Sequence, residues 1–176
     1  LSGPAKRLLP PDIHHMEPTL ILRIFEDGLF AAIASIGFSS ISNTPRRAYL
    51  CCGVTAAVGH AIRFILMEPG LAGMGIIWAS TIAAFVIGIL GVLLAPTVKC
   101  PAEVCLCPAL LPMIPGMYAY RAVAATISCL SATDEPAFNH YLYLLNYNGM
   151  TCVFVIIGMV VAVNLPVFMM KRISFQ

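Results

Sequence analysis

Five long apolar stretches follow one another along the chain, separated by short connections rich in turn residues and charges. They cover residues 18–41, 48–67, 73–95, 104–130 and 141–170. At a helical rise of about 1.5 Å per residue, each is long enough to cross a hydrocarbon core roughly 30 Å thick. The pattern therefore predicts an all-α integral membrane protein with five transmembrane helices. We expect an N-terminal extension over residues 1–17 and a five-span transmembrane domain over residues 18–176.

The fourth apolar stretch differs from the others because turn-forming residues interrupt it. These are Pro108, Pro112, Pro115 and Gly116. Proline removes an amide donor and clashes with the carbonyl four residues back, so we expect a broken helix. Freed backbone groups must face protein or water, and helix ends at a break bind ions or carboxylates. With Tyr120 and Arg121 behind it, the break is a candidate substrate site; simple kinked packing is the alternative.

The second stretch carries His60 and Arg63, three positions apart and so on one helical face. His60 lies about 18 Å from the start of this stretch, near the bilayer midplane. Because imidazole titrates near neutrality, His60 is a candidate for proton transfer or for a hydrogen bond to substrate. A neutral histidine bonded to a neighbouring helix is the alternative. Arg63 lies nearer the outer end, where its side chain can also extend to the surface.

Two adjacent acids, Glu26 and Asp27, occupy the outer half of the first stretch. Arg23 lies one turn before them and can pair with one carboxylate on the same helix. We expect the other acid to meet Arg63 or Arg121 from another span. Glu26, Asp27 and His60 are therefore the candidate proton-coupling residues. A cavity with two arginines and broken helix ends would suit a solute that bears a carboxylate.

The composition restricts the function further. The chain of 176 residues is 60% hydrophobic and only 10% charged, against about 25% charged in soluble domains. A net charge of +2 without a basic, aromatic-rich patch argues against nucleic-acid binding. Among seven cysteines, Cys100, Cys105 and Cys107 cluster, but no histidine or paired C-x-x-C spacing accompanies them. We expect structural cysteines, no metal site and no cofactor.

The charges of the connections indicate an orientation. With five spans, the termini lie on opposite sides. The side of the C-terminus holds Arg46, Arg47, Lys99, Lys171 and Arg172, whereas the other side holds Lys6, Arg7 and the acids Glu68, Asp134 and Glu135. Positively charged loops stay cytoplasmic, so we expect the N-terminus outside and the C-terminus inside.

Three motifs of this sequence resemble the threonine/serine exporter family, most closely its small-subunit (YjjB-type) form. They are Asn43-Thr44-Pro45-Arg46-Arg47-Ala48, then Gly59-His60 with Arg63, then Ile114-Pro115-Gly116-Met117-Tyr118-Ala119-Tyr120-Arg121. The resemblance implies a multi-pass protein of the bacterial inner membrane that exports threonine and serine, or a dicarboxylate such as succinate, with the proton gradient. It also implies a larger partner subunit with five spans and a cytoplasmic domain, in a hetero-oligomer or higher oligomer.

Two hypotheses of function follow. The first is half of a secondary exporter, in which His60, Arg63, Pro112, Pro115, Gly116, Tyr120 and Arg121 line the path of the solute. The second is a membrane scaffold that stabilises or regulates the larger subunit without transporting. An enzyme is disfavoured, because no Ser/His, paired-carboxylate or metal-ligand spacing supports one.

Overall fold

The computed structural model describes residues 17–170, with side chains from residue 20 onward, and all regular secondary structure in that range is helical. The elements, in order, are α1 (Glu17–Ile41), η2 (Arg46–Ala48), α2 (Tyr49–Met67), α3 (Ile76–Val98), α4 (Ala102–Leu110), η3 (Leu111–Met113), α5 (Gly116–Ser131) and α6 (Glu135–Met169). The expected all-α class is thus confirmed for the described residues. Nearly all of the expected N-terminal extension, with Lys6 and Arg7, lies outside them, as do Lys171 and Arg172.

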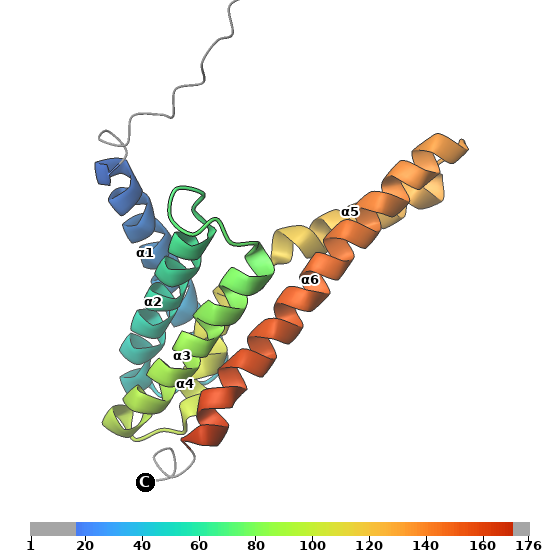
Figure 1. Cartoon of the computed structure of the whole chain (residues 1–176). Coiled ribbons are helices and arrows are strands. Elements are labelled where there is room, and N and C mark those ends of the chain that lie inside the picture. The colour runs from blue at the N-terminus through green and yellow to red at the C-terminus, as the bar shows by residue number, and fades with distance from the viewer. Residues whose placement is uncertain (1–16, 171–176) are drawn as a thin grey trace, which may run out of the picture.

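Helices α1, α2 and α3 run alternately down and up, the bent pair α4–α5 runs up, and α6 returns, so that the start of α1 and the end of α6 lie at opposite ends of the molecule (Figure 1). Helices α1 to α4 and the C-terminal half of α6 form one bundle, in which α3 packs on α6 and α2 lies between α1 and α3. Arg47 of the connection before α2 donates from Nη2 to the carbonyl of Lys99 after α3, at 3.1 Å. The basic connections therefore meet at the end of the molecule where α6 ends.

Small residues allow the helices of the bundle to approach closely. The buried core is built largely from alanines such as Ala83, Ala84 and Ala109, filled by Ile87 and Met113. At Gly88 of α3, an added Cβ would lie 2.7 Å from the carbonyl oxygen of Val163, so only glycine permits this contact between α3 and α6.

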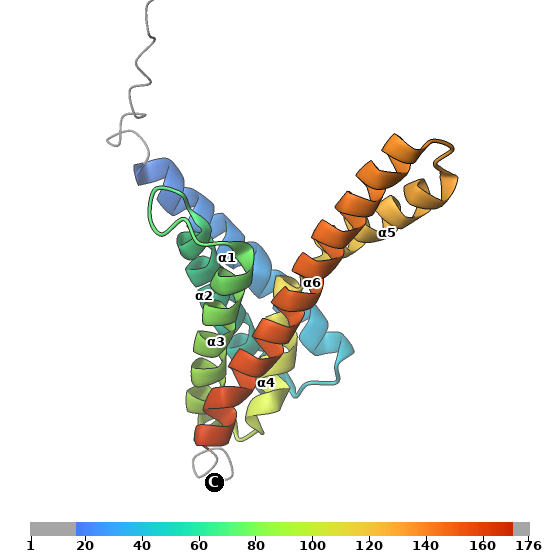
Figure 2. The same ribbon diagram turned by 45° about the vertical axis from the view of Figure 1, so that its right-hand side comes forward.

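The expected break in the fourth apolar stretch is present, but it divides the stretch at a different residue. Pro108 lies inside α4 without ending it, and the break follows η3 at residues 114–115. The segments Ala102–Met113 and Gly116–Ser131 meet at an angle of 52°. Beyond the break, α5 and the first half of α6 leave the bundle as an antiparallel pair, which we call the arm (Figure 2).

We expected five membrane spans, but fewer of the described helices are long and apolar enough to cross a membrane. Three segments qualify, Arg46–Met67, Ile76–Val98 and Glu135–Met169, and the bent pair α4–α5 would be a fourth. Helix α1, the expected first span, has 25 residues but is not among them. Helix α6 begins six residues earlier than expected, because Asp134 caps it by accepting a hydrogen bond from the Ala137 amide at 3.4 Å.

Candidate functional site

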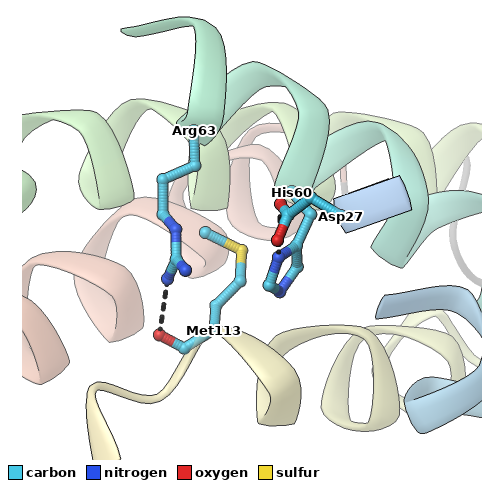
Figure 3. A network of polar contacts seen from close by, with 4 residues as sticks. All are labelled: Asp27, His60, Arg63 and Met113. Carbon is cyan, nitrogen blue, oxygen red and sulfur yellow. Dashed lines mark hydrogen bonds and ion pairs between the residues drawn. The ribbon is translucent and has the colours of Figure 1, made fainter. Parts of the chain in front are cut away.

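An acid–histidine contact joins α1 to α2 inside the bundle. Nδ1 of His60 lies 3.2 Å from Oδ2 of Asp27, and this is the one ion-pair contact found between side chains of the described residues (Figure 3). The His60 side chain is only 7% exposed, whereas that of Asp27 is 38% exposed. The imidazole of His60 therefore lies in the interior of the bundle, and the carboxylate of Asp27 connects it to the surface.

The second ring nitrogen of His60 is buried, and within residues 17–170 it has no hydrogen-bond partner. An ionised carboxylate only accepts hydrogen bonds, so Nδ1 of a neutral ring carries the proton toward Asp27. Nε2 then presents a lone pair, which can only accept a hydrogen bond. When the ring gains a proton, Nε2 becomes a donor instead. The backbone of Pro112 lies near this ring, so the change occurs beside the helix break.

Arg63 holds the break itself. Its Nη1 donates to the carbonyl oxygen of Met113, the last residue of η3, at 3.0 Å (Figure 3). The carbonyls at a helix end lack partners within the helix, and a buried one without a partner is costly. This freed backbone group therefore faces protein, one of the two environments, protein or water, that the sequence analysis allowed. We expected an acid to meet Arg63 or Arg121; instead Asp27 bonds to His60, and Arg63 bonds to a carbonyl.

Gly59 lets neighbouring helices close around His60. A Cβ at this position would collide with Cδ1 and Cγ1 of Ile87 in α3, and it would lie 3.6 Å from the sulfur of Met113. Both neighbours are fully buried. The Gly-His pair of the sequence thus has a steric role as well as a polar one, because the missing side chain makes room for α3 and η3.

The remaining candidates from the sequence are divided by the break. Pro115 is buried and Pro112 half-buried next to the network, while Gly116, Tyr120 and Arg121 are exposed on α5. Glu26 and Arg23 are exposed on α1, and no hydrogen bond or ion pair joins them to each other or to Asp27. The structure therefore brings together Asp27, His60, Arg63 and the Pro112–Pro115 break, and leaves Glu26, Tyr120 and Arg121 outside this network. The sequence analysis did not identify Met113, because this residue acts through its backbone carbonyl, a group that every residue has.

The cysteines form a separate cluster at the basic end of the molecule. Cys52 of α2 and Cys105 of α4 are buried against Ala48, and Cys51 and Cys100 pack around them. All seven thiols are free, and Cys107, which we had grouped with Cys100 and Cys105, is exposed. Among residues 17–170, no group of three or more His, Cys, Asp or Glu side chains is arranged to hold a metal ion.

Long apolar helices that enclose an acid–histidine pair and an arginine define a membrane-embedded helical protein with a polar centre. The chain belongs to the threonine/serine exporter family, whose family model (Threonine/Serine exporter, ThrE) matches residues 27–169. That family is one of membrane transporters. The matched range contains the whole Asp27–His60–Arg63 network and the break.

One curated relative gives a more limited match. An uncharacterized protein of Haemophilus influenzae is 36% identical over 107 residues, which are 61% of this chain and 35% of that protein. The match thus covers only about a third of that relative's length. No solved structure matches the chain.

Proposed function

We propose that this chain is the membrane subunit of a proton-driven secondary exporter for small solutes that carry a carboxylate. It works with a larger five-span subunit that has a cytoplasmic domain, in the bacterial inner membrane, with the N-terminus outside and the C-terminus inside. The single observation that carries the proposal is the contact between His60 and Asp27 beside the helix break. Ionisable groups at membrane depth are costly and usually mark a path for protons or solutes.

In this proposal the proton moves through the pair. Asp27, which is partly exposed, takes up a proton from water and passes it to Nδ1 of the buried His60 ring, in the tautomer whose own proton is on Nε2. The imidazolium then releases the Nε2 proton on the side of the helix break, which leaves Nδ1–H facing the carboxylate of Asp27. The release turns Nε2 from a donor into an acceptor, next to the backbone of Pro112. The gain or loss of one proton thereby changes the hydrogen bonding available at the break, and this change moves η3 relative to α2.

The solute carboxylate binds at the guanidinium of Arg63 and at the helix ends of the break. Arginine has five N–H donors, and the carbonyl of Met113 takes one of them. The N-terminus of α5 begins at Gly116, where the first amides have no partner within the helix and favour an anion. Threonine, serine and a dicarboxylate such as succinate all satisfy this chemistry.

The test is efflux from proteoliposomes that contain this chain with the larger subunit. An imposed proton gradient drives export of labelled threonine, serine or succinate from the complex with native His60. The variant His60→Ala abolishes gradient-driven export, while complex assembly measured by co-purification stays intact. The matched control is His140→Ala, because His140 is exposed on α6, far along the chain from the break. Equal export from both variants contradicts the mechanism.

A scaffold without transport is the second candidate, and one observation favours it. A groove of about 500 Å³ beside the pair is lined entirely by apolar residues of α1 and α2, so it offers no polar path through this chain alone. The two candidates differ in what the larger subunit does by itself. Full efflux from vesicles with the larger subunit alone supports the scaffold, whereas efflux that requires both chains supports the exporter.

A further inference from the structure

Two buried thiols join α2 to α4 at the basic end of the bundle. Cys52 and Cys105 are fully buried and pack against each other and Ala48. Sγ of Cys52 donates to the carbonyl oxygen of Val104, the residue directly before Cys105, at 3.9 Å. A side-chain hydrogen bond also joins the two thiols. The two sulfurs therefore lie side by side, although they belong to different helices.

This contact gives the pair a chemical property that a packing role does not require. A cysteine in an apolar stretch commonly serves as a small hydrophobic residue, which is the structural role that we expected from the sequence. Two thiols in contact can also be oxidised to a disulfide, because side-chain rotation brings the sulfurs to the ~2.05 Å of an S–S bond. Both are free thiols in the structure. Cys52 and Cys105 thus form a dithiol that can link α2 to α4 covalently.

A half-buried thiol lies between this dithiol and the surface. Buried thiols react poorly on their own, because oxidants attack accessible thiolates. Cys100 belongs to the connection between α3 and α4, is half-buried, and packs against the cluster of Cys52 and Cys105. Its Sγ donates to the carbonyl oxygen of Val98, the last residue of α3, at 3.4 Å. An oxidant from the basic end therefore meets Cys100 before it meets the buried pair.

We propose that Cys52 and Cys105 form a redox-sensitive disulfide, which closes when hydrogen peroxide oxidises Cys100. The peroxide transfers one oxygen atom to the Cys100 thiol, which becomes a sulfenic acid, and one water is released. The Cys105 thiol attacks that sulfur, so a Cys100–Cys105 disulfide forms and a second water leaves. The Cys52 thiol then attacks the Cys105 sulfur, forms the final disulfide and returns Cys100 to a thiol. In total, two thiols lose two hydrogen atoms, and the peroxide is reduced to two waters.

The disulfide constrains the helix break. Helix α4 continues through η3 into the break, while α2 carries His60 and Arg63. A covalent bond between α2 and α4 therefore limits the movement of η3 relative to α2. In the proposed orientation this end of the bundle faces the cytoplasm, where thiols stay reduced and the rare disulfides usually act as redox sensors. The expected consequence, a loss of export on oxidation, rests on the proposed function, whereas the disulfide itself does not.

Peptide mapping tests the bond in the native chain. Membranes that contain the full chain are exposed to hydrogen peroxide, free thiols are blocked with N-ethylmaleimide, and trypsin releases the peptides 48–63 and 100–121. In chains that migrate as monomers, we expect a link between these peptides, which fragmentation assigns to Cys52 and Cys105 and which dithiothreitol removes. No link, or links that involve only other cysteines, overturns the proposal and leaves the pair a packing role.

Substitutions of single cysteines test the route of oxidation. We expect Cys100→Ser to lose the Cys52–Cys105 link at peroxide exposures that link the native chain. Cys51→Ser, at the other half-buried thiol of the cluster, is the matched control and keeps the link. Cys107→Ser also keeps it, although Cys107 is exposed, because that thiol lies outside the cluster. Equal linking in Cys100→Ser and Cys51→Ser overturns the route through Cys100.

Amide hydrogen exchange tests the constraint on the break without a transport measurement. We expect residues 111–118 to exchange more slowly in the peroxide-treated chain, and dithiothreitol to restore the faster exchange. Dithiothreitol distinguishes the disulfide from oxidised methionines, whose repair requires dedicated reductases. Exchange that peroxide leaves unchanged overturns the constraint.

Efflux separates this proposal from the proposed function. In proteoliposomes with the larger subunit, we expect peroxide to abolish gradient-driven export and dithiothreitol to restore it. A complex that exports in neither state contradicts the proposed function, while a mapped Cys52–Cys105 link still supports the disulfide. Export that continues in fully linked chains overturns the regulatory consequence.

Discussion

Asp27 and His60 meet through Oδ2 and Nδ1 at 3.2 Å, although 33 positions separate them and they belong to different helices. Asp27→Asn keeps an oxygen acceptor for the ring and removes the charge. We therefore expect Asp27→Asn to assemble normally and to lose gradient-driven export, measured as solute efflux at a fixed proton gradient. Glu103→Gln, which neutralises an exposed acid of α4, is the control and leaves export unchanged.

Removal of the acceptor has a further consequence. Asp27→Ala leaves Nδ1 of a buried ring unpaired, which costs about 1–3 kcal/mol. A lower melting temperature of the purified protein is therefore expected for Asp27→Ala and not for Asp27→Asn. If both variants melt like the native protein, the contact does not contribute to the stability of the bundle.

The hydrogen bond from Arg63 to Met113 fixes the helix break to α2. Arg63→Met keeps the apolar stem and removes every donor, so the Met113 carbonyl loses its partner at a cost of about 1–3 kcal/mol. We expect a lower melting temperature and faster amide hydrogen exchange confined to residues 111–118. Arg23→Met is the matched control, because Arg23 is exposed on α1 and makes no hydrogen bond within the described residues. Equal exchange in both variants would remove Arg63 from this role.

The apolar pattern predicted the approximate positions of the helices, and the prolines predicted the break in the fourth stretch. It also directed attention to His60 and Arg63, since polar groups in an apolar stretch need partners inside the protein. Helix ends were less predictable. Pro96 lies in the last turn of α3, where we expected the helix to have ended, and Pro108 lies inside α4.

The choice of partners could not be predicted, because a sequence states neither the order of helices nor their rotation. Glu26 and Asp27 are about 100° apart around α1, so only one of them can face α2. The rotation of α1 that decides between them depends on close contacts such as that of Gly28 with Ala57. The arm could not be predicted either, since the same apolar pattern is expected of a helix inside the bundle and of one that leaves it.

Gly59 is a steric requirement next to His60. In Gly59→Ala the new Cβ meets Ile87, which is fully buried and cannot move without displacing its neighbours. Overpacking of this kind costs about 1–3 kcal/mol, so we expect a lower melting temperature. Gly37→Ala is the control, because nothing lies within 4 Å of a Cβ at that position of α1.

A second substitution distinguishes this clash from a loss of backbone freedom. Ile87→Val removes Cδ1, the atom that the new Cβ would strike, so Ile87→Val in the Gly59→Ala background is expected to regain part of the lost stability. If the double variant is less stable than Gly59→Ala alone, the cost arises elsewhere than at this contact.

The orientation in the membrane is tested at the two ends of the bundle. Ser42 lies in the connection beside Arg46 and Arg47, and Leu71 is exposed in the connection between α2 and α3, at the opposite end (Figure 1). Because basic connections remain cytoplasmic, we expect a membrane-impermeant maleimide to label Leu71→Cys in intact cells. Ser42→Cys should be labelled only after the membrane is permeabilised.

The native cysteines provide the background for this measurement. Cys107 is exposed on α4, and its labelling in the unsubstituted chain is subtracted from that of each variant. The reversed pattern, with Ser42→Cys labelled in intact cells and Leu71→Cys protected, would place Arg46, Arg47 and Lys99 outside. It would also reverse the direction in which Asp27 exchanges protons. The start of α1 would then lie on the cytoplasmic side, and the coupling proton would enter the pair from the cytoplasm rather than from outside.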